Sequence, residues 1–438
     1  MKINLFHKLF VWTALLAITT SCSFISTPMS NPTQATTLLP TQTFAPTLEN
    51  GLTPTSSQSG PTQTVAPTYM GADIQHECVT ADESQTLPNV QGAIAMLGAN
   101  NDLSLWNLET GKNTALGRIE ILNGVSSNGQ KLAYIDADLH KLIIVSSQGE
   151  KLATIVAPNN WVEVLGWASS NNILVDNMPF HQDGSWEPPS STIVLNLSDG
   201  TQTELSPNYP NIYGYASGAP NLGPYSYSIT AYDPTLSYVV YPTETSTESS
   251  IVLWDIANHR QIARLQLPFP WNTPLWRNDG ESFLVSVPLK YSDWQGNVYK
   301  NVPDDSPYIG GNELFSVNRS GEIKRLTYLT TKYMAEEQSY VWSPDNKMVA
   351  FWLKIGTDNA KWELATLNLE TSTITSYCID GGDGSYSIFW SPDGNQIMST
   401  IQNSDSDTKI VFLDIQKKIA VLVPGKEIVV GWLSTIAH

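Results

Sequence analysis

Eight aromatic and acidic residues stand in long polar segments between the apolar runs of this 438-residue chain. They are Trp161, Trp186, Trp271, Trp294, Tyr213, Tyr291, Asp183 and Asp293. Flat rings beside carboxylates offer apolar area together with hydrogen bonds, a combination that suits sugar rings or a peptide. We therefore predict that this set binds an extracellular glycan or protein. Packing of each ring onto its own scaffold is the alternative, and it is the better interpretation for any one ring alone.

The same segments carry further carboxylates, which leave a hydrolytic alternative open. Two carboxyl groups about 5 to 10 Å apart can cleave a glycosidic bond. The candidates are Asp183, Glu187, Asp293, Asp304, Asp305, Glu336 and Glu337. The sequence contains no G-x-S-x-G nucleophile motif and no histidines paired at metal-ligand spacing. We predict no catalytic residue, no metal and no cofactor. Two functions stay open: a non-catalytic binding or scaffolding module, and a surface carbohydrate-active or hydrolytic enzyme that uses these carboxylates.

The first 22 residues are typical of an export signal. Two lysines precede an apolar run, Leu9–Ile18, that is too short to span a bilayer. The Thr-Ser-Cys sequence that ends at Cys22 resembles a bacterial lipoprotein box, in which the cysteine is lipidated and becomes the new N-terminus. Thr19 stands where such a box usually has Leu. We predict a lipid anchor at Cys22, with secretion as the alternative.

Residues 23–72 predict a disordered stalk, because a segment of mostly Pro, Thr, Ser and Gln cannot bury enough apolar surface to order itself. The folded domain is then 73–438. This organisation places the domain on the extracytoplasmic face of the cell membrane, held there by the lipid. Cys78 and Cys378 either form a disulfide or remain two separate buried thiols, and the sequence leaves both open.

The charge balance argues against nucleic acid as a partner. Asp and Glu number 41 against 23 for Lys and Arg, which gives a formal net charge of -18. A field of that sign repels phosphate backbones. No run of basic residues offsets it.

One sequence phrase recurs about every 40 to 65 residues. It consists of an aromatic or apolar anchor, a turn of Ser, Asn, Asp or Gly, and an apolar strand. The copies begin at Val125, Trp167, Tyr232, Trp276, Trp342 and Trp390. Each copy predicts a hairpin, and most are followed by a second one. Four short strands per repeat predict an all-β fold, the β-propeller.

The phrase WSPDG at Trp390, and its variant WSPDN at Trp342, resemble the blades of two groups of proteins. These are the TolB-type periplasmic propellers and the propeller domains of prolyl oligopeptidase-like peptidases. The resemblance covers about residues 90–433. It implies the WD-repeat-like blade and the fold, and it says little about activity.

The two ends of the domain determine the predicted number of blades. Residues 90–117 supply a strand and a hairpin that lack an anchor strand, and residues 426–438 (KEIVVGWLSTIAH) supply an anchor strand with nothing after it. Joined, they complete one blade in which Trp432 is the anchor. The prediction is a seven-bladed propeller closed by the C-terminal strand, with six or eight blades as alternatives. The long aromatic segments then all lie on one face.

Overall fold

The computed structural model of the chain describes residues 73–83, 90–156, 162–177, 191–204, 231–244, 249–266, 274–288, 311–331, 333, 335–356, 360–382, 386–402, 408–425 and 427–435. In these ranges the regular structure is β-strand, with one 3-10 helix, η3 (Leu329–Thr331). No helix among them is long and apolar enough to cross a membrane. The predicted export signal, Cys22 and the stalk lie outside the described residues.

Three sheets each consist of four strands that pair antiparallel in chain order. Their strands are β9 (Val162–Trp167), β10 (Asn172–Asn177), β11 (Ser191–Asn196) and β12 (Gln202–Glu204); β13 (Ala231–Tyr232), β14 (Tyr238–Glu244), β15 (Ser249–Asp255) and β16 (Arg260–Gln266); and β17 (Leu275–Trp276), β18 (Ser282–Pro288), β19 (Asn312–Asn318) and β20 (Ile323–Arg325). The first pair of each sheet is one of the predicted hairpins, at Trp167, Tyr232 and Trp276.

Two further sheets have the same order and gain a fifth strand at the outer edge. One contains β21 (Ala335–Trp342), β22 (Met348–Ile355), β23 (Trp362–Asn368) and β24 (Thr373–Asp380); the other contains β25 (Ile388–Trp390), β26 (Gln396–Gln402), β27 (Thr408–Asp414) and β28 (Ile419–Pro424). The added strands, β1 (Ile74–His76) and β2 (Ala81–Asp82), pair in parallel with β24 and β28. We call residues 74–82 the N-terminal strap. Sequence reasoning missed it, because strands this short carry no alternating pattern.

The last sheet has seven strands, in the order β29-β3-β4-β5-β6-β7-β8. They are β29 (Ile428–Leu433), β3 (Ala93–Leu97), β4 (Asp102–Asn107), β5 (Asn113–Val125), β6 (Lys131–Asp136), β7 (Lys141–Ser146) and β8 (Lys151–Ile155). The C-terminal strand pairs antiparallel with β3, its partner expected from the sequence. The 13-residue β5 pairs with β4 along its first half and with β6 along its second. Because β5 is continuous, sheets and blades need not be equal in number.

Anchor tryptophans join successive sheets. The indole N–H of Trp342 donates to the carbonyl of Leu275 at 3.1 Å, which links β21 to the first strand of the preceding sheet. Trp390 makes the same bond to Val341, at 3.3 Å. Both rings are at most 7% exposed. A buried indole needs one hydrogen-bond acceptor, so this bond suits an apolar interface. These two tryptophans therefore belong to the core.

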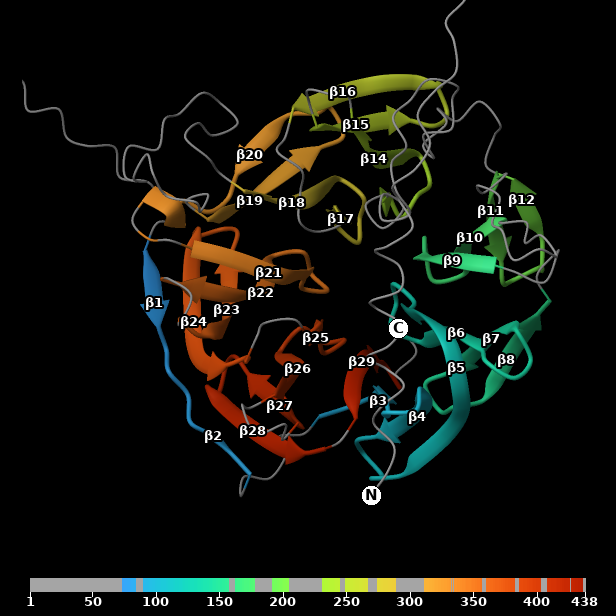
Figure 1. The fold of residues 1–438 in the computed structure, drawn as a ribbon, viewed down its shortest axis with the longest axis horizontal. Helices are drawn as coiled ribbons and strands as arrows, with labels where there is room; N and C mark the ends of the chain where they lie inside the picture. Colours follow the sequence, from blue (N-terminus) through green and yellow to red (C-terminus); the bar gives the residue numbers. More distant parts are fainter. Residues whose placement is uncertain are drawn as a thin grey trace, which may run out of the picture. The chain divides into compact units, whose positions relative to one another are not determined.

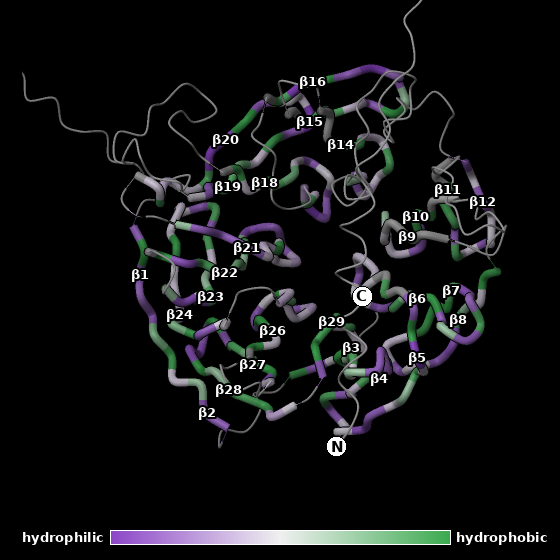
Figure 2. The backbone as a smooth tube through the Cα atoms, in the orientation of Figure 1, coloured by the Kyte–Doolittle hydropathy of each residue, from purple (hydrophilic) through white to green (hydrophobic). Residues whose placement is uncertain are grey.

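Apolar side chains fill the space between neighbouring sheets. One cluster packs Leu253 of β15 against Phe283 and Phe315 of β18 and β19, and another packs Leu364 of β23 against Val411 of β27. In Figure 2, hydrophobic residues stand out along β26 and β27, whereas β12 is hydrophilic and exposed. Figure 1 shows the sheets arranged about a common centre, with β17, β21, β25 and β29 innermost. This arrangement is an all-β propeller.

Candidate functional site

The segments that carry the predicted ligand residues connect equivalent strand ends of the sheets. These segments are 157–161, 178–190, 205–230, 267–273 and 289–310, and the structure describes none of these. Each connects a second to a third strand, or a last strand to the first strand of the next sheet. Neighbouring antiparallel strands alternate in direction, so all five segments begin and end at the same end of their sheets. We call this end the long-loop face. The eight predicted ligand residues remain a prediction.

Two carboxylates meet inside the described part of the chain. Glu313 is the second residue of β19 and Glu337 lies in β21, and both are 0% exposed. Arg325, at the end of β20, donates from Nη2 to Glu313 Oε1 at 3.0 Å, and from Nε to the carbonyl of Thr327 at 2.8 Å. The Thr327 hydroxyl donates to Glu337 Oε1 at 3.0 Å. We call these residues the buried carboxylate cluster.

The two carboxylates differ in their surroundings. Burial raises the pKa of Glu337 well above its ordinary value, and the negative charge of Glu313 raises it further. The Thr327 hydroxyl and the charge of Arg325 act in the opposite direction but are outweighed. Glu313 accepts a charge-assisted bond from Arg325 Nη2 at 3.0 Å and a bond from the backbone N–H of Thr330 at 2.6 Å. Burial and the neighbouring carboxylate therefore favour the protonated form of Glu337.

A raised carboxyl pKa beside a second carboxylate is one signature of a glycosidase. Here both side chains are sealed between β19 and β21, so no substrate can reach them. Of the hydrolytic candidates on the sequence, Glu337 is in this cluster and Glu336 pairs with Lys354 at 3.7 Å. Glu313 was missed, because it stands in an ordinary apolar strand pattern (NELFSVN). The cluster is thus structural.

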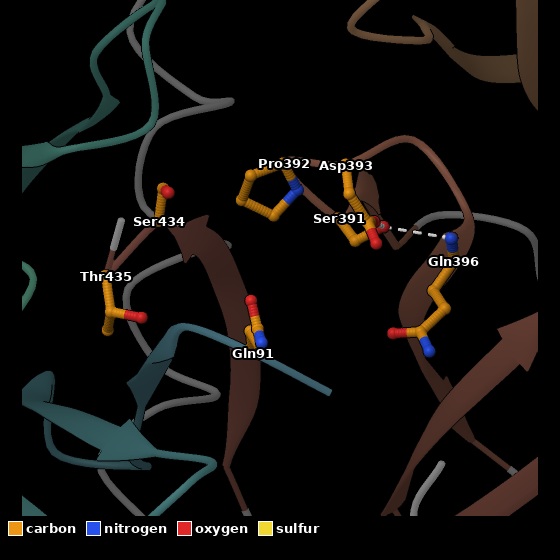
Figure 3. Close-up of a pocket in the computed structure, with 7 residues that line it drawn as sticks. All are labelled: Gln91, Ser391, Pro392, Asp393, Gln396, Ser434 and Thr435. Carbon is orange, nitrogen blue, oxygen red and sulfur yellow. Dashed lines mark hydrogen bonds between the residues drawn. The ribbon is translucent and has the colours of Figure 1, made fainter. Parts of the chain in front are cut away.

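A small cavity lies where the first turn of the β25 sheet approaches the end of β29 (Figure 3). Its volume is about 50 Å³. Ser391 Oγ accepts from the backbone N–H of Gln396 at 2.9 Å and donates to Asp393 Oδ1 at 2.5 Å. The polar side chains at this site therefore shape the turn. The volume accommodates water molecules.

A larger cavity of about 270 Å³ lies beside the N-terminal strap. Its polar lining residues are His76, Lys361, Glu363 and Ser376. The apolar part of the wall consists of Ile74, Tyr333, Leu353, Ile355 and Ala360. This cavity is at the rim of the β21–β24 sheet, and two of its residues come from β1.

Next to this cavity, Cys78 forms a disulfide with Cys378 of β24. The two Cα atoms are 4.8 Å apart, and 300 residues separate the cysteines in the chain. The structure thus decides the alternative that the sequence left open. The bond holds the strap against β24, to which β1 already adds as a parallel strand.

No protein-family model and no curated protein sequence matches this chain. Solved structures do: the chain is structurally similar to TolB-like and other propeller proteins at low identity. TolB from Acinetobacter baumannii is 11% identical, with 78% of this chain and 82% of that chain covered and a TM-score of 0.41. A puromycin-hydrolyzing peptidase from Mycobacterium tuberculosis is 12% identical, with 84% and 58% covered and a TM-score of 0.45. Hydrazine synthase from Kuenenia stuttgartiensis is 11% identical, with 78% and 98% covered and a TM-score of 0.36. These likenesses concern the fold.

Proposed function

We propose that the chain is a non-catalytic binding or scaffolding propeller that presents its long-loop face to a surface glycan, peptide or protein. The observation that carries the proposal is topological. Every segment with a predicted ligand residue leaves from the same end of the sheets, while the opposite turns are short. Loops that a rigid scaffold holds on one side are common sites of recognition. The packed sheets and their anchor tryptophans supply that rigidity.

The hydrolytic alternative is less well supported. It requires paired carboxylates at an accessible place, one of them with a raised pKa. In the described part of the chain, the pair with that property is Glu313 and Glu337, and neither is exposed. A binding surface of aromatic rings needs no such pair.

We further propose seven blades. The two halves of β5 divide the seven-stranded sheet into a blade of β29, β3, β4 and residues 113–118 and a blade of residues 119–125, β6, β7 and β8. Five other sheets then complete the count. The β29–β3 pairing would close the ring, because it joins the C-terminal strand to the strand that begins the first blade.

Binding is tested with a glycan array and a pull-down on the extracytoplasmic domain. The double variant Trp186→Ala/Trp294→Ala is expected to lose binding by 10-fold or more, on the order of the effect of removing hot-spot aromatics. The control is Leu152→Ala, which removes an exposed apolar side chain near the opposite end of β8, and it should bind as the wild type does. Equal loss in both variants, or none in the first, contradicts the assignment to the long-loop face.

The location is proposed to be the extracytoplasmic face of the cell membrane, through a lipid on Cys22, with secretion as the alternative. The Cys78–Cys378 disulfide supports an oxidising compartment in either case. A labelled fatty acid fed to expressing cells should enter the wild type but not Cys22→Ala. Equal labelling of the two proteins would reject the anchor.

A further inference from the structure

The N-terminal strap brings metal-ligating side chains together at the rim of the β21–β24 sheet. His76 is the last residue of β1, Glu363 lies in β23 and Cys378 in β24. The ligand atoms of these three side chains all lie within 4.8 Å of one another. Cys78, the disulfide partner of Cys378, adds a second sulfur at the same place. Among the residues that the structure describes, this is the group with metal-ligand composition and spacing.

Hydrogen bonds orient this group. The Ser376 hydroxyl donates to Glu363 Oε2, and the backbone N–H of Cys378 donates to Ser376 Oγ at 3.2 Å. Glu363 Oε1 stays outside this pair of bonds and can accept another contact. Partners of this kind fix the direction of a ligating carboxylate and are typical of metal sites. Ser376 is itself buried, at 1% exposure, so its orientation is restricted.

We propose that opening the Cys78–Cys378 disulfide converts this group into a binding site for Zn²⁺ or a similar borderline-soft divalent metal. A small-molecule dithiol supplies two electrons and two protons as it is oxidised to its own disulfide, and the two protein sulfurs become thiols. On metal binding, each coordinating thiol releases its proton to solvent. His76, Glu363 and Cys378 are three ligands, and Cys78 is the fourth.

The ligand set selects the class of metal. Thiolate sulfur, imidazole nitrogen and one carboxylate oxygen favour zinc over the hard cations, which take oxygen ligands. Zinc bonds of about 2.0 to 2.3 Å place tetrahedral ligand atoms roughly 3.4 to 3.7 Å apart. The three ligand atoms need to approach by only about an ångström from their present spacing of at most 4.8 Å. His76 is exposed and its side chain can make that movement.

The cavity of about 270 Å³ beside the strap supplies an entry path, because His76 and Glu363 both line it. The disulfide and the metal exclude each other, since a sulfur in a disulfide is not a thiolate. In an oxidising compartment the strap is held by the covalent bond. Where thiols stay reduced, the metal would hold it to the same sheet.

Cobalt is a suitable probe, since a thiolate bound to Co²⁺ gives a charge-transfer absorption that free Co²⁺ lacks. The variant Cys78→Ser keeps three ligands and needs no reductant. It should bind one Co²⁺, with the charge-transfer band, and added Zn²⁺ should displace the cobalt. Adding His76→Ala or Glu363→Gln should weaken binding by about 10-fold or more. Oxidised wild type should show no such band.

The matched control is Cys78→Ser/His140→Ala. His140 contacts Glu120 at 2.9 Å, but no cysteine belongs to that pair, so its removal should leave cobalt binding unchanged. The titration is repeated with wild-type protein that has been reduced with a dithiol and desalted without oxygen. This second measurement ensures that a folding defect of Cys78→Ser does not decide the result. Absence of the band in both proteins, or equal binding after loss of His76 or Glu363, overturns the proposal.

Discussion

The buried carboxylate cluster and the metal-ligating group at the strap (His76, Glu363 and Cys378) each contain a glutamate of the β21–β24 sheet, but the two glutamates differ in access to water. Glu337 in β21 is 0% exposed and Glu363 in β23 of the same sheet is partly exposed. In the buried interface the pKa of Glu337 is raised by burial and by the neighbouring Glu313, and Glu313 is paired with Arg325. At the rim, Glu363 keeps an oxygen available beside a histidine and a sulfur. A fully buried carboxylate thus serves the packing of the fold, whereas a partly exposed one can still bind a ligand.

The largest expected effect comes from removing the cation of the buried carboxylate cluster. Arg325→Met leaves Glu313 buried without its partner, and the free energy of unfolding should fall by about 3 to 5 kcal/mol. Chemical denaturation measures the loss. The double variant Glu313→Gln/Arg325→Met removes both charges and should recover much of it. A loss below about 1 kcal/mol in the single variant would show that the pair is not desolvated.

Glu337→Gln has a smaller effect, and it depends on pH. Below the ordinary carboxyl pKa of 4.5, Glu337 is protonated in both the folded and the unfolded chain. As pH rises above 4.5, the unfolded chain loses this proton while the folded chain keeps it, so stability falls until the raised folded pKa is reached. One such group contributes at most about 1.4 kcal/mol per pH unit. Glu337→Gln should lack this contribution and be more stable than the wild type at neutral pH. Denaturation midpoints between pH 4 and 8 measure the difference, and parallel profiles for the two proteins would contradict it.

Glu363→Gln is the matched substitution at the rim and should have the smallest effect on stability. Glu363 is partly exposed, and Gln can still accept from the Ser376 hydroxyl. We expect a change within about 1 kcal/mol in the free energy of unfolding, measured by chemical denaturation. A pH-dependent gain like that expected for Glu337→Gln would mean that the two carboxylates share one environment, and the comparison would fail.

Local signals account for what sequence reasoning predicted correctly. The hairpins at Trp342 and Trp390 follow from a turn of Ser, Pro, Asp and Asn or Gly between strand-forming residues. In those turns Ser343 and Ser391 accept from the backbone N–H groups five residues on, at 2.9 Å. The anchor tryptophans Trp276, Trp342 and Trp390 of three copies are buried, at 6 to 7% exposure. The blade pattern is therefore present in each repeat by itself.

Contacts between segments that are distant in the chain could not be predicted from the sequence. Glu313 contacts Arg325 and lies near Glu337 only because β19, β20 and β21 pack together. The spacing of these residues in the chain does not predict the contact. The strap adds β1 and β2 to sheets whose strands come some 300 residues later in the chain. Three- and two-residue strands have no periodicity to detect.

By itself the sequence determined the all-β repeat, the hairpins and the partner of the C-terminal strand, because turn chemistry and alternating side chains act over a few residues. The tertiary structure alone decided that Cys78 bonds Cys378, that β5 is continuous across two halves of one sheet, and that Glu337 is sealed while Glu363 is not. These features depend on which surfaces exclude water once the sheets pack. That property belongs to the assembled fold and not to any single segment.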